Sequence, residues 1–216
     1  MAKVVSIEDA VKNIDSGKSV MIGGFMAIGT PENIIDRIVK KEIGDLTVIA
    51  NDTALPDQGI GKLIANKQVK KVVATHIGLN PETGRQMNND ELEVELIPQG
   101  TLAEQIRSAG AGLGGFLTPT GVGTVVEDGK EKKTINGKDY LLELPILAEV
   151  ALIKAWKADK KGNLVYRKSA RNFNPIMATA ADLVIVEVEN LVETGEINPD
   201  DVVTPAAFVD MIVEVD

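Results

Sequence analysis

The sequence contains no cysteine and only one histidine, His76, among its 216 residues. The absence of thiols excludes disulfides, thiolate zinc sites and cysteine nucleophiles. A single imidazole cannot build a multi-histidine metal centre either. We therefore expect no metal ion and no zinc or thiol redox chemistry.

Long apolar runs are also missing. No stretch reaches the length of a membrane span, and residues 1–8 lack the uninterrupted apolar region of a secretory signal. The 23 basic and 32 acidic residues give a net charge of -9, which offers no electrostatic support for binding nucleic acid or an anionic membrane. These features predict a cytoplasmic protein that binds neither nucleic acid nor membrane.

The charge is unevenly distributed along the chain. Residues 182–216 contain ten acidic residues and no basic one. Residues 154–171 carry seven Lys or Arg against the single acid Asp159, which would suit a polyanionic small molecule or a partner surface as well as a solvated face.

Apolar segments alternate between the strand and helix patterns, and 44% apolar residues are enough for a single domain over 1–216. Nearly continuous apolar runs at 20–22, 46–50, 72–75, 94–97, 151–153 and 183–186 are typical of strands covered on both faces. Helix signals lie between them: Ser6 as a cap with Gly17 as a stop, Thr30-Pro31 before an isoleucine-rich face, a capping box from Thr101 to Glu104, and residues 175–181. The pattern predicts an α/β fold, with a mainly parallel sheet covered by helices on both faces and a small hairpin insertion near 133–143.

A glycine-rich segment, residues 23–31, joins the first buried strand to a helix. Glycines let backbone amides approach a ligand, and the helix start adds free N–H groups, so the segment favours an anion-binding or oxyanion-binding loop over a plain turn. In such a sheet, ligands bind at the carboxyl ends of the strands. Asn51 and Gln99 follow two other strands and could point at the same ligand, although each could equally be an ordinary polar loop residue.

Residues 110–123 contain six glycines and a formal G-x-G-x-x-G. The dinucleotide fingerprint needs a strand before it and a helix after it, whereas here a helix precedes the glycines and a loop follows, so NAD binding is not expected. A long glycine-rich loop in a compact domain is usually a binding element or a cover, and disorder is the alternative.

Several motifs resemble the family I coenzyme A transferases. They are the run Val20-Met21-Ile22-Gly23-Gly24-Phe25-x-x-x-Gly29-x-Pro31, together with segments 50–53, 76–85, 98–102, 110–130, 170–175 and 192–196. The resemblance covers nearly the whole chain. Residues 80–85 (Asn-Pro-Glu-Thr-Gly-Arg) make it closest to the alpha subunits of bacterial acetate and butyrate-acetoacetate CoA-transferases.

The resemblance implies a CoA-transferase fold of the NagB-RpiA-like type and a ping-pong transfer of CoA between a short-chain acyl-CoA and a short-chain carboxylate. The candidate pairs are acetyl-CoA, acetoacetyl-CoA or butyryl-CoA with acetate, acetoacetate or butyrate. A glutamate nucleophile attacks the thioester in this family. It belongs to a Ser-Glu-Asn-Gly type motif of the beta subunit, and nothing here matches that motif: Glu189-Asn190 has the wrong neighbours. The resemblance therefore implies an α2β2 or larger assembly with a beta subunit, no catalytic glutamate in this chain, and no cofactor apart from CoA as the carrier in the substrate.

The CoA-binding and substrate-binding residues that we predict belong to the glycine loop, to two strand ends and to the second glycine segment. They are Gly23, Gly24, Phe25, Met26, Ala27, Ile28, Gly29, Asn51, Gln99, Gly100, Gly112, Gly114, Gly115 and Phe116. Two other hypotheses remain open. One is a non-catalytic regulatory subunit that binds an acyl-CoA or a sugar phosphate. The other is a sugar-phosphate isomerase-like enzyme that would use His76 and Glu32.

Overall fold

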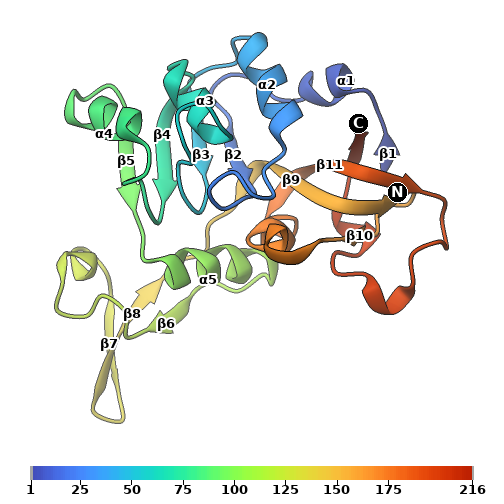
Figure 1. The fold of residues 1–216 in the computed structure, drawn as a ribbon. Helices are drawn as coiled ribbons and strands as arrows, with labels where there is room; N and C mark the ends of the chain where they lie inside the picture. Colours follow the sequence, from blue (N-terminus) through green and yellow to red (C-terminus); the bar gives the residue numbers. More distant parts are fainter. Residues whose placement is uncertain (1, 216) are drawn as a thin grey trace.

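The computed structural model, which describes residues 2–215, contains one large sheet, helices on both of its faces, and a smaller sheet that projects from it (Figure 1). The strands are β1 (Lys3–Val4), β2 (Ser19–Ile22), β3 (Leu46–Ile49), β4 (Val69–Ala74), β5 (Glu93–Leu96), β6 (Phe116–Thr118), β7 (Lys132–Ile135), β8 (Lys138–Glu143), β9 (Ala148–Asp159), β10 (Leu164–Val165), β11 (Ala181–Val192) and β12 (Met211–Glu214). The α-helices are α1 (Ile7–Val11), α2 (Glu32–Lys40), α3 (Ile60–Ala65), α4 (Pro81–Asn88), α5 (Gln99–Gly110) and α6 (Asn174–Met177). Short 3-10 turns are η1 (Val125–Glu127), η2 (Lys168–Arg171), η3 (Pro199–Asp201) and η4 (Ala206–Phe208).

The large sheet has the strand order β1-β12-β11-β9-β2-β3-β4-β5, and every neighbouring pair along this path is parallel. Only β10, which pairs with β9, is antiparallel. From β2 the chain winds outward through β3, β4 and β5, and it then returns to β9 on the other side of β2 before continuing to β11 and β12. The winding direction therefore reverses between β2 and β9, which is where ligands bind in open α/β sheets.

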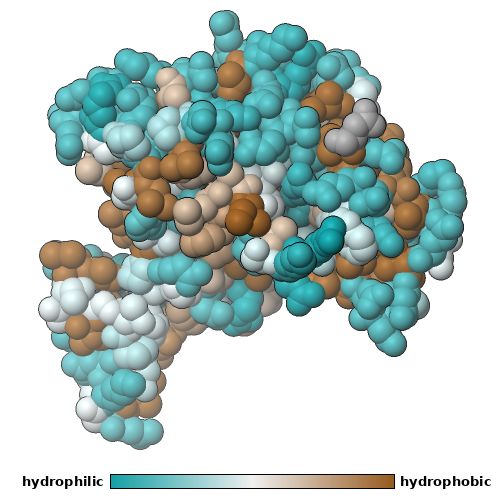
Figure 2. Space-filling model, in the orientation of Figure 1, coloured by the Kyte–Doolittle hydropathy of each residue, from teal (hydrophilic) through white to brown (hydrophobic). Residues whose placement is uncertain are grey.

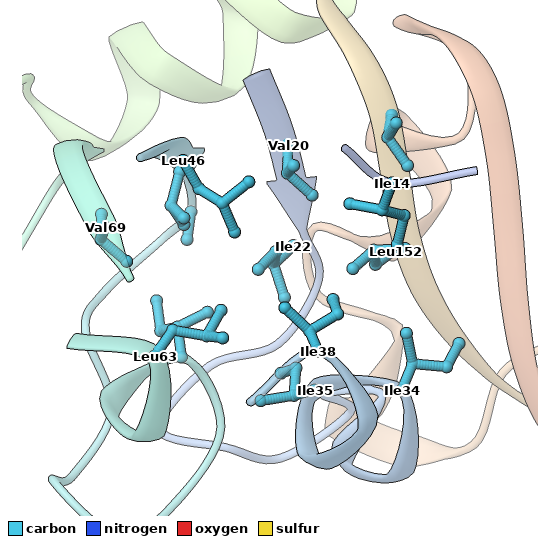
Figure 3. Packing of buried hydrophobic residues seen from close by; sticks show 14 of the residues in the cluster. Ile14, Val20, Ile22, Ile34, Ile35, Ile38, Leu46, Leu63, Val69 and Leu152 are labelled. Atoms are coloured by element: carbon cyan, nitrogen blue, oxygen red, sulfur yellow. The ribbon is translucent and has the colours of Figure 1, made fainter. Parts of the chain in front are cut away.

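Two apolar cores cover the two faces of this sheet. Along β2, Val20 and Ile22 point into the core formed with α1, α2 and α3, whereas Met21 points into the core formed with α5 and α6. Successive residues of a strand face opposite sides, so β2 is buried on both faces as its continuous apolar sequence predicts. Figure 3 shows the first core, in which Ile34, Ile35 and Ile38 of α2 pack under the strands with no exposed surface.

The first helix confirms one of its two sequence signals. The Ser6 hydroxyl accepts a hydrogen bond from the Asp9 amide at 3.1 Å and so caps α1. Helix α1 ends at Val11, however, and Gly17 (φ +86°) instead forms the turn before β2. The prediction that Gly17 ends this helix was wrong.

Helix α5 begins earlier than the predicted capping box. Pro98 takes the position before the first turn, and its carbonyl accepts a hydrogen bond from the Leu102 amide at 2.9 Å. Thr101 is consequently buried inside the helix, where its hydroxyl caps nothing, and Glu104 pairs with Arg107. The strand ends only two residues before Pro98, which has no N–H to donate and suits a helix start.

Two further predictions fail at the edges of elements. Strand β5 is the edge of the sheet and is largely exposed, with Leu96 54% exposed, although its apolar sequence suggested cover on both faces. Helix α6 ends at Met177 because Ala181 already pairs with Ala148 in the ladder between β11 and β9. A local apolar run does not show which strand lies at the edge of the sheet, or at which residue the chain begins to pair with a strand that is distant in sequence.

The predicted hairpin forms, with Asn136 (φ +51°) and Gly137 (φ +77°) in the turn between β7 and β8. It belongs to a three-stranded antiparallel sheet, because β6 in the second glycine segment pairs with the other edge of β8. This small sheet projects from the body of the molecule, below α5 in Figure 1. The segment that we expected to be a long loop is therefore partly a strand.

The visible face of the molecule mixes hydrophilic and hydrophobic patches, and the projecting sheet carries both (Figure 2). Within residues 2–215, no helix combines the length and the apolar character needed to cross a bilayer.

Candidate functional site

The glycine loop, residues 23–31, lies where the sheet reverses its winding direction. It leaves the carboxyl end of β2 and leads into α2, next to the neighbouring strand β9. The Gly23 amide donates a 2.9 Å hydrogen bond to the carbonyl of Leu152 on β9, so the loop begins by continuing the sheet ladder. The sequence prediction of a loop at the strand ends is confirmed in its position.

The two leading glycines are required by the packing of the chain itself. A Cβ on Gly23 would lie 1.8 Å from Asn174 Oδ1, and a Cβ on Gly24 would lie 1.9 Å from Thr30 Oγ1. Gly24 also has φ +127°, a conformation that other residues rarely adopt. Sequence reasoning attributed these glycines to close approach of a ligand, but contacts within the chain already require them.

The middle of the loop is a tight turn built from larger residues. Phe25 and Ile28 exchange two backbone hydrogen bonds of 3.0 and 2.9 Å across Met26 (φ +48°) and Ala27 (φ +67°). Two consecutive left-handed residues without glycine cost about 1–2 kcal/mol each. The Met26 amide donates to Asp52 Oδ2 at 3.0 Å, which helps to hold the turn. Phe25, Met26 and Ile28 remain 50%, 43% and 53% exposed.

Most amides of the loop are already engaged, contrary to the expectation that the whole loop presents them to a ligand. Two of its amides, those of Ala27 and Gly29, donate to no acceptor among residues 2–215. The other amides between residues 23 and 28 are satisfied internally, namely Gly23 by Leu152, Gly24 by Asn172, Phe25 by Ile28, Met26 by Asp52 and Ile28 by Phe25.

Two asparagines from a distant segment hold the loop in place. Asn172 accepts from the Gly24 amide at 3.1 Å and donates to the Ile28 carbonyl at 2.9 Å. Asn174 donates to the Gly29 carbonyl at 2.9 Å, and its Oδ1 accepts from the Lys154 amide at 3.0 Å. We did not predict either residue as part of the site. The only signal in the sequence was their place in the motif over residues 170–175.

An apolar cavity of about 430 Å³ opens on one side of the loop. Its lining brings together three residues predicted from separate strand ends, Phe25, Asn51 and Gln99. The full lining is Phe25, Asn51, Gln99, Ala103, Ser169, Asn172, Phe173 and Ile176. The Gln99 side chain makes no hydrogen bond with another described residue and is therefore available to a ligand.

A second space next to the loop is a basic groove of about 470 Å³. Ala27 and Gly29, which carry the two available amides, line it together with residues of β9 and of the predicted basic stretch. These are Lys154, Trp156, Arg167 and Lys168. The Arg167 guanidinium lies 5.7 Å from the centre of the Trp156 ring, and neither Arg167 nor Lys168 forms an ion pair with a residue that the structure describes. Ser169 lines both the groove and the apolar cavity, so the two spaces meet there.

The acidic residues near the groove are already paired. Glu32 accepts from the Gly59 amide at 2.7 Å and lies 2.8 Å from Lys62, and Glu189 lies 3.4 Å from Lys154. Beneath them, Glu187 of β11 has no exposed surface and accepts from the Asn33 and Ile34 amides at the start of α2, at 2.9 and 3.1 Å. Burial raises the pKa of the Glu187 carboxyl, although these hydrogen bonds and Lys154 at 3.6 Å oppose the rise.

Backbone strain is concentrated around these two spaces. In addition to Met26 and Ala27, the lining residues Lys168 (φ +51°) and Asn172 (φ +20°) have positive φ angles without being glycine. Such strain persists only where the surrounding contacts enforce it, and it is common at ligand sites.

The remaining predicted residues lie elsewhere. Gly100 is exposed in the first turn of α5, and Gly112, Gly114, Gly115 and Phe116 line neither the cavity nor the groove. Gly115 has a packing role, because a Cβ there would lie 2.7 Å from the Glu143 carbonyl. His76 is exposed and lines neither space. A ligand contact from these residues stays a prediction.

The family model for coenzyme A transferases matches residues 4–215 of this chain. The chain belongs to the coenzyme A transferase family. This transferase is 56% identical over 211 residues to the alpha subunit of acetate CoA-transferase from Escherichia coli K12, and the match covers 98% of this chain and 96% of that protein. It is 51% identical to the alpha subunit of the acetoacetyl-CoA:acetate/butyrate CoA transferase of Clostridium acetobutylicum, over 99% of this chain and 98% of that one. It is also 50% identical to one chain of a probable succinyl-CoA:3-ketoacid coenzyme A transferase of Bacillus subtilis, over 99% of this chain and 90% of the Bacillus chain.

Solved structures agree on the fold. The acyl-CoA transferase YdiF of Escherichia coli O157:H7, in a thioester complex with CoA, superimposes with a TM-score of 0.87 at 22% identity. The superposition covers the whole of this transferase chain and 47% of the YdiF chain, so our chain spans about half of that protein. Glutaconate CoA-transferase of Acidaminococcus fermentans gives a TM-score of 0.86 at 21% identity, over 99% of this chain and 76% of that one. The parallel sheet with helices on both faces is the shared architecture.

Proposed function

We propose that this chain is the alpha subunit of a heteromeric CoA-transferase that moves CoA between short-chain acyl-CoA thioesters and short-chain carboxylates. The activities for which the alpha-subunit relatives are named, at 51–56% identity over nearly the full chain, support this assignment. One observation about the site carries the proposal further. The apolar cavity, which is the place for an acyl group beside the glycine loop, has no carboxylate in its lining.

Because this lining has no carboxylate, and Glu32 and Glu189 of the groove are already paired, we assign the nucleophile to a glutamate of a beta subunit. Its oxygen attacks the thioester carbonyl carbon, and the C–S bond breaks to release the CoA thiolate and leave an acyl-glutamyl anhydride. The thiolate then attacks the glutamyl carbonyl, which forms a glutamyl-CoA thioester and frees the first carboxylate. The second carboxylate reverses both steps and receives the CoA.

This chain contributes binding and orientation to these steps. Gln99, whose amide has no partner within residues 2–215, can donate to the carbonyl oxygen on which negative charge develops. The free amides of Ala27 and Gly29, together with Arg167 and Lys168, suit the phosphates of CoA in the basic groove. Held by Asn172 and Asn174, the glycine loop contributes residues to both spaces and keeps them in a fixed geometry.

Mixing of purified chains tests the proposal. A candidate beta subunit is purified separately, and CoA exchange between acetyl-CoA and butyrate is followed by chromatography of the acyl-CoAs. We expect turnover only from the mixture. Borohydride trapping followed by peptide mass spectrometry should place the glutamyl-CoA adduct on the partner. Turnover by this chain alone, or an adduct on one of its own carboxylates, would contradict the proposal.

A variant of Gln99 tests the role of this chain inside the complex. Gln99→Ala should lower kcat by about tenfold or more, because a donor to the developing oxyanion is lost, without dissociating the subunits. The matched control is Gln58→Ala, another exposed glutamine, which lines neither space and should leave kcat unchanged. If the two variants have the same kcat, Gln99 is an ordinary surface residue and does not stabilise the oxyanion.

A further inference from the structure

The Asn172 side chain is fully used by contacts within the chain. Its Oδ1 accepts hydrogen bonds from the amides of Gly24 and Phe173, at 3.1 and 2.7 Å. Its Nδ2 donates to the carbonyls of Ile28 and Ser169, at 2.9 and 3.0 Å. A side-chain amide has two donor hydrogens and two acceptor lone pairs on its oxygen. Because all four are occupied, Asn172 has no polar group left for a substrate, although it lines the apolar cavity.

The bond from Asn172 to Ile28 also acts on the amide of the next residue. The Ile28 carbonyl and the Gly29 N–H belong to one planar trans peptide unit, so the two groups point in opposite directions. By holding the carbonyl, Asn172 directs the Gly29 N–H away from itself. The Phe25 amide donates to the same carbonyl at 3.0 Å from within the turn, whereas Asn172 lies 144 residues away in the sequence and ties the peptide to a different part of the fold.

The Gly29 N–H that is oriented in this way is one of the two loop amides without an acceptor among residues 2–215. Gly29 lines the basic groove together with Arg167 and Lys168. A backbone N–H beside two cations suits an anionic oxygen. Gly29 has φ +78°, and glycine adopts positive and negative φ about equally well, so its own conformation does not hold the amide in this direction.

The backbone of Asn172 is strained at the same place. Its φ of +20° and ψ of -121° are a conformation that residues with a side chain rarely adopt. Glycine at position 172 would be less strained, but it would lack the amide group that holds the Ile28 carbonyl. The contacts of the side chain therefore maintain a conformation that the backbone alone does not favour.

We propose that Asn172 is a positioning residue, which orients the Gly29 amide toward a phosphate oxygen of the CoA substrate in the basic groove. The inference rests on the proposed transferase function. A phosphate suits this groove better than the carboxylate of the acceptor does, because its several charged oxygens can use the amide and both cations together. Asn172 itself touches no substrate atom and takes no part in the chemical steps.

The test compares acetyl-CoA with acetyl-pantetheine, which has the same thioester but no phosphate, in the reconstituted complex with butyrate as the acceptor. Asn172→Ala should lower kcat/KM for acetyl-CoA by about tenfold, because a hydrogen bond to a charged oxygen is lost. Its kcat/KM for acetyl-pantetheine should change by less than about twofold. Asn172→Gly should behave in the same way. This variant accepts the φ of +20° without strain, so it separates loss of the side-chain amide from backbone strain.

A second measurement does not depend on the rate with the truncated substrate. Adenosine 3′,5′-bisphosphate carries phosphates of CoA without the thioester arm, and it should inhibit the wild-type complex in competition with acetyl-CoA. In Asn172→Gly, its inhibition constant should rise by about tenfold. Arg167→Ala removes a cation of the groove directly and should raise the same constant.

The matched control is Asn66→Ala. The Asn66 side chain also donates to a backbone carbonyl, that of Lys62 at 2.8 Å, but it lies at the end of α3 and lines neither space. This variant should keep the wild-type values for both thioesters and for the inhibitor.

The inference is overturned if the Asn172 variants lose the same factor in kcat/KM with both thioesters, since Asn172 would then hold the loop without directing an amide at a phosphate. It is also overturned if neither the inhibition constant nor kcat/KM for acetyl-CoA changes, or if only the KM for butyrate rises. Failure of the proposed function looks different, because the wild-type mixture of chains would then convert no acyl-CoA.

Discussion

At the scale of single residues, the glycine loop shows that one pattern can have two physical causes. Glycine is needed at positions 23 and 24 because Asn174 and Thr30 occupy the space of a side chain. At Met26 and Ala27, by contrast, the chain keeps larger residues in left-handed conformations where glycine would be less strained. Most of the loop amides that the glycines suggested would be free donate to acceptors elsewhere in the loop or in the rest of the chain, and two remain for a ligand.

We expect Gly24→Ala to destabilise the protein by about 2 kcal/mol or more, because the methyl group meets Thr30 and φ +127° is unfavourable for alanine. Urea unfolding followed by circular dichroism measures the change. Gly100→Ala is the control, since a Cβ there meets open space in the first turn of α5 and should leave stability within about 0.5 kcal/mol of the wild type or raise it. Equal stability of Gly24→Ala and wild type would show that the loop tolerates a side chain.

At the scale of elements, the helix starts show which features can be predicted from residues that are close in sequence. The Ser6 cap and the isoleucine face of α2 form as predicted, because each depends on residues within one or two turns. The capping box at Thr101 fails because Pro98 and the end of β5 start the helix earlier. Residues 80–85, which drove the resemblance to alpha subunits, form the capped start of α4, where Arg85 joins Glu82 and Glu91.

Asn80 offers a test at this scale. Its Oδ1 accepts from the Glu82 and Thr83 amides at 3.1 and 3.3 Å, and its Nδ2 donates to the Thr53 carbonyl at 2.9 Å while the residue is 1% exposed. Asn80→Ala should therefore cost about 2 kcal/mol in free energy of unfolding, from the lost cap and the buried carbonyl left without a donor.

The matched control for Asn80 is Asn66→Ala. Asn66 is exposed, and its side chain donates to the Lys62 carbonyl at the end of α3. This change should stay within about 0.5 kcal/mol of wild type. Similar losses for the two asparagines in urea unfolding would refute a special role for the α4 cap.

At the scale of the whole molecule, Glu187 connects β11, the start of α2 and the basic groove. Its carboxylate is buried, accepts hydrogen bonds from α2, and faces Lys154, whose other acidic neighbour is Glu189. Because burial raises the pKa of Glu187 above its value in the unfolded chain, its contribution to stability is complete at low pH and is lost as the pH rises through the folded pKa.

We expect the free energy of unfolding of the wild type to fall, relative to Glu187→Gln, as the pH is raised from about 5 to about 8, because the amide does not ionise. Urea unfolding of both proteins across this range measures the difference. A constant difference between Glu187→Gln and wild type would contradict a raised pKa.

Much of this molecule could be predicted from its sequence. The alternation of strands and helices, the turn at Asn136-Gly137, the family, and the position of the glycine loop all depend on local patterns and were confirmed. The strand-end argument also brought Phe25, Asn51 and Gln99 to one cavity, although their contact with substrate stays a prediction.

Only the tertiary structure decided which side chains hold the glycine loop in place and which polar groups of the site have no hydrogen-bond partner in the chain. Asn172 reaches Gly24 across 148 residues of sequence, and Asn174 reaches Gly29 across 145. No local pattern predicts such contacts, because they depend on β9 returning beside β2 after the chain has wound outward to β5. Local propensity depends on a few neighbouring residues. The site, by contrast, lies where the sheet reverses its winding direction, and its chemistry depends on strands that become neighbours only in the folded sheet.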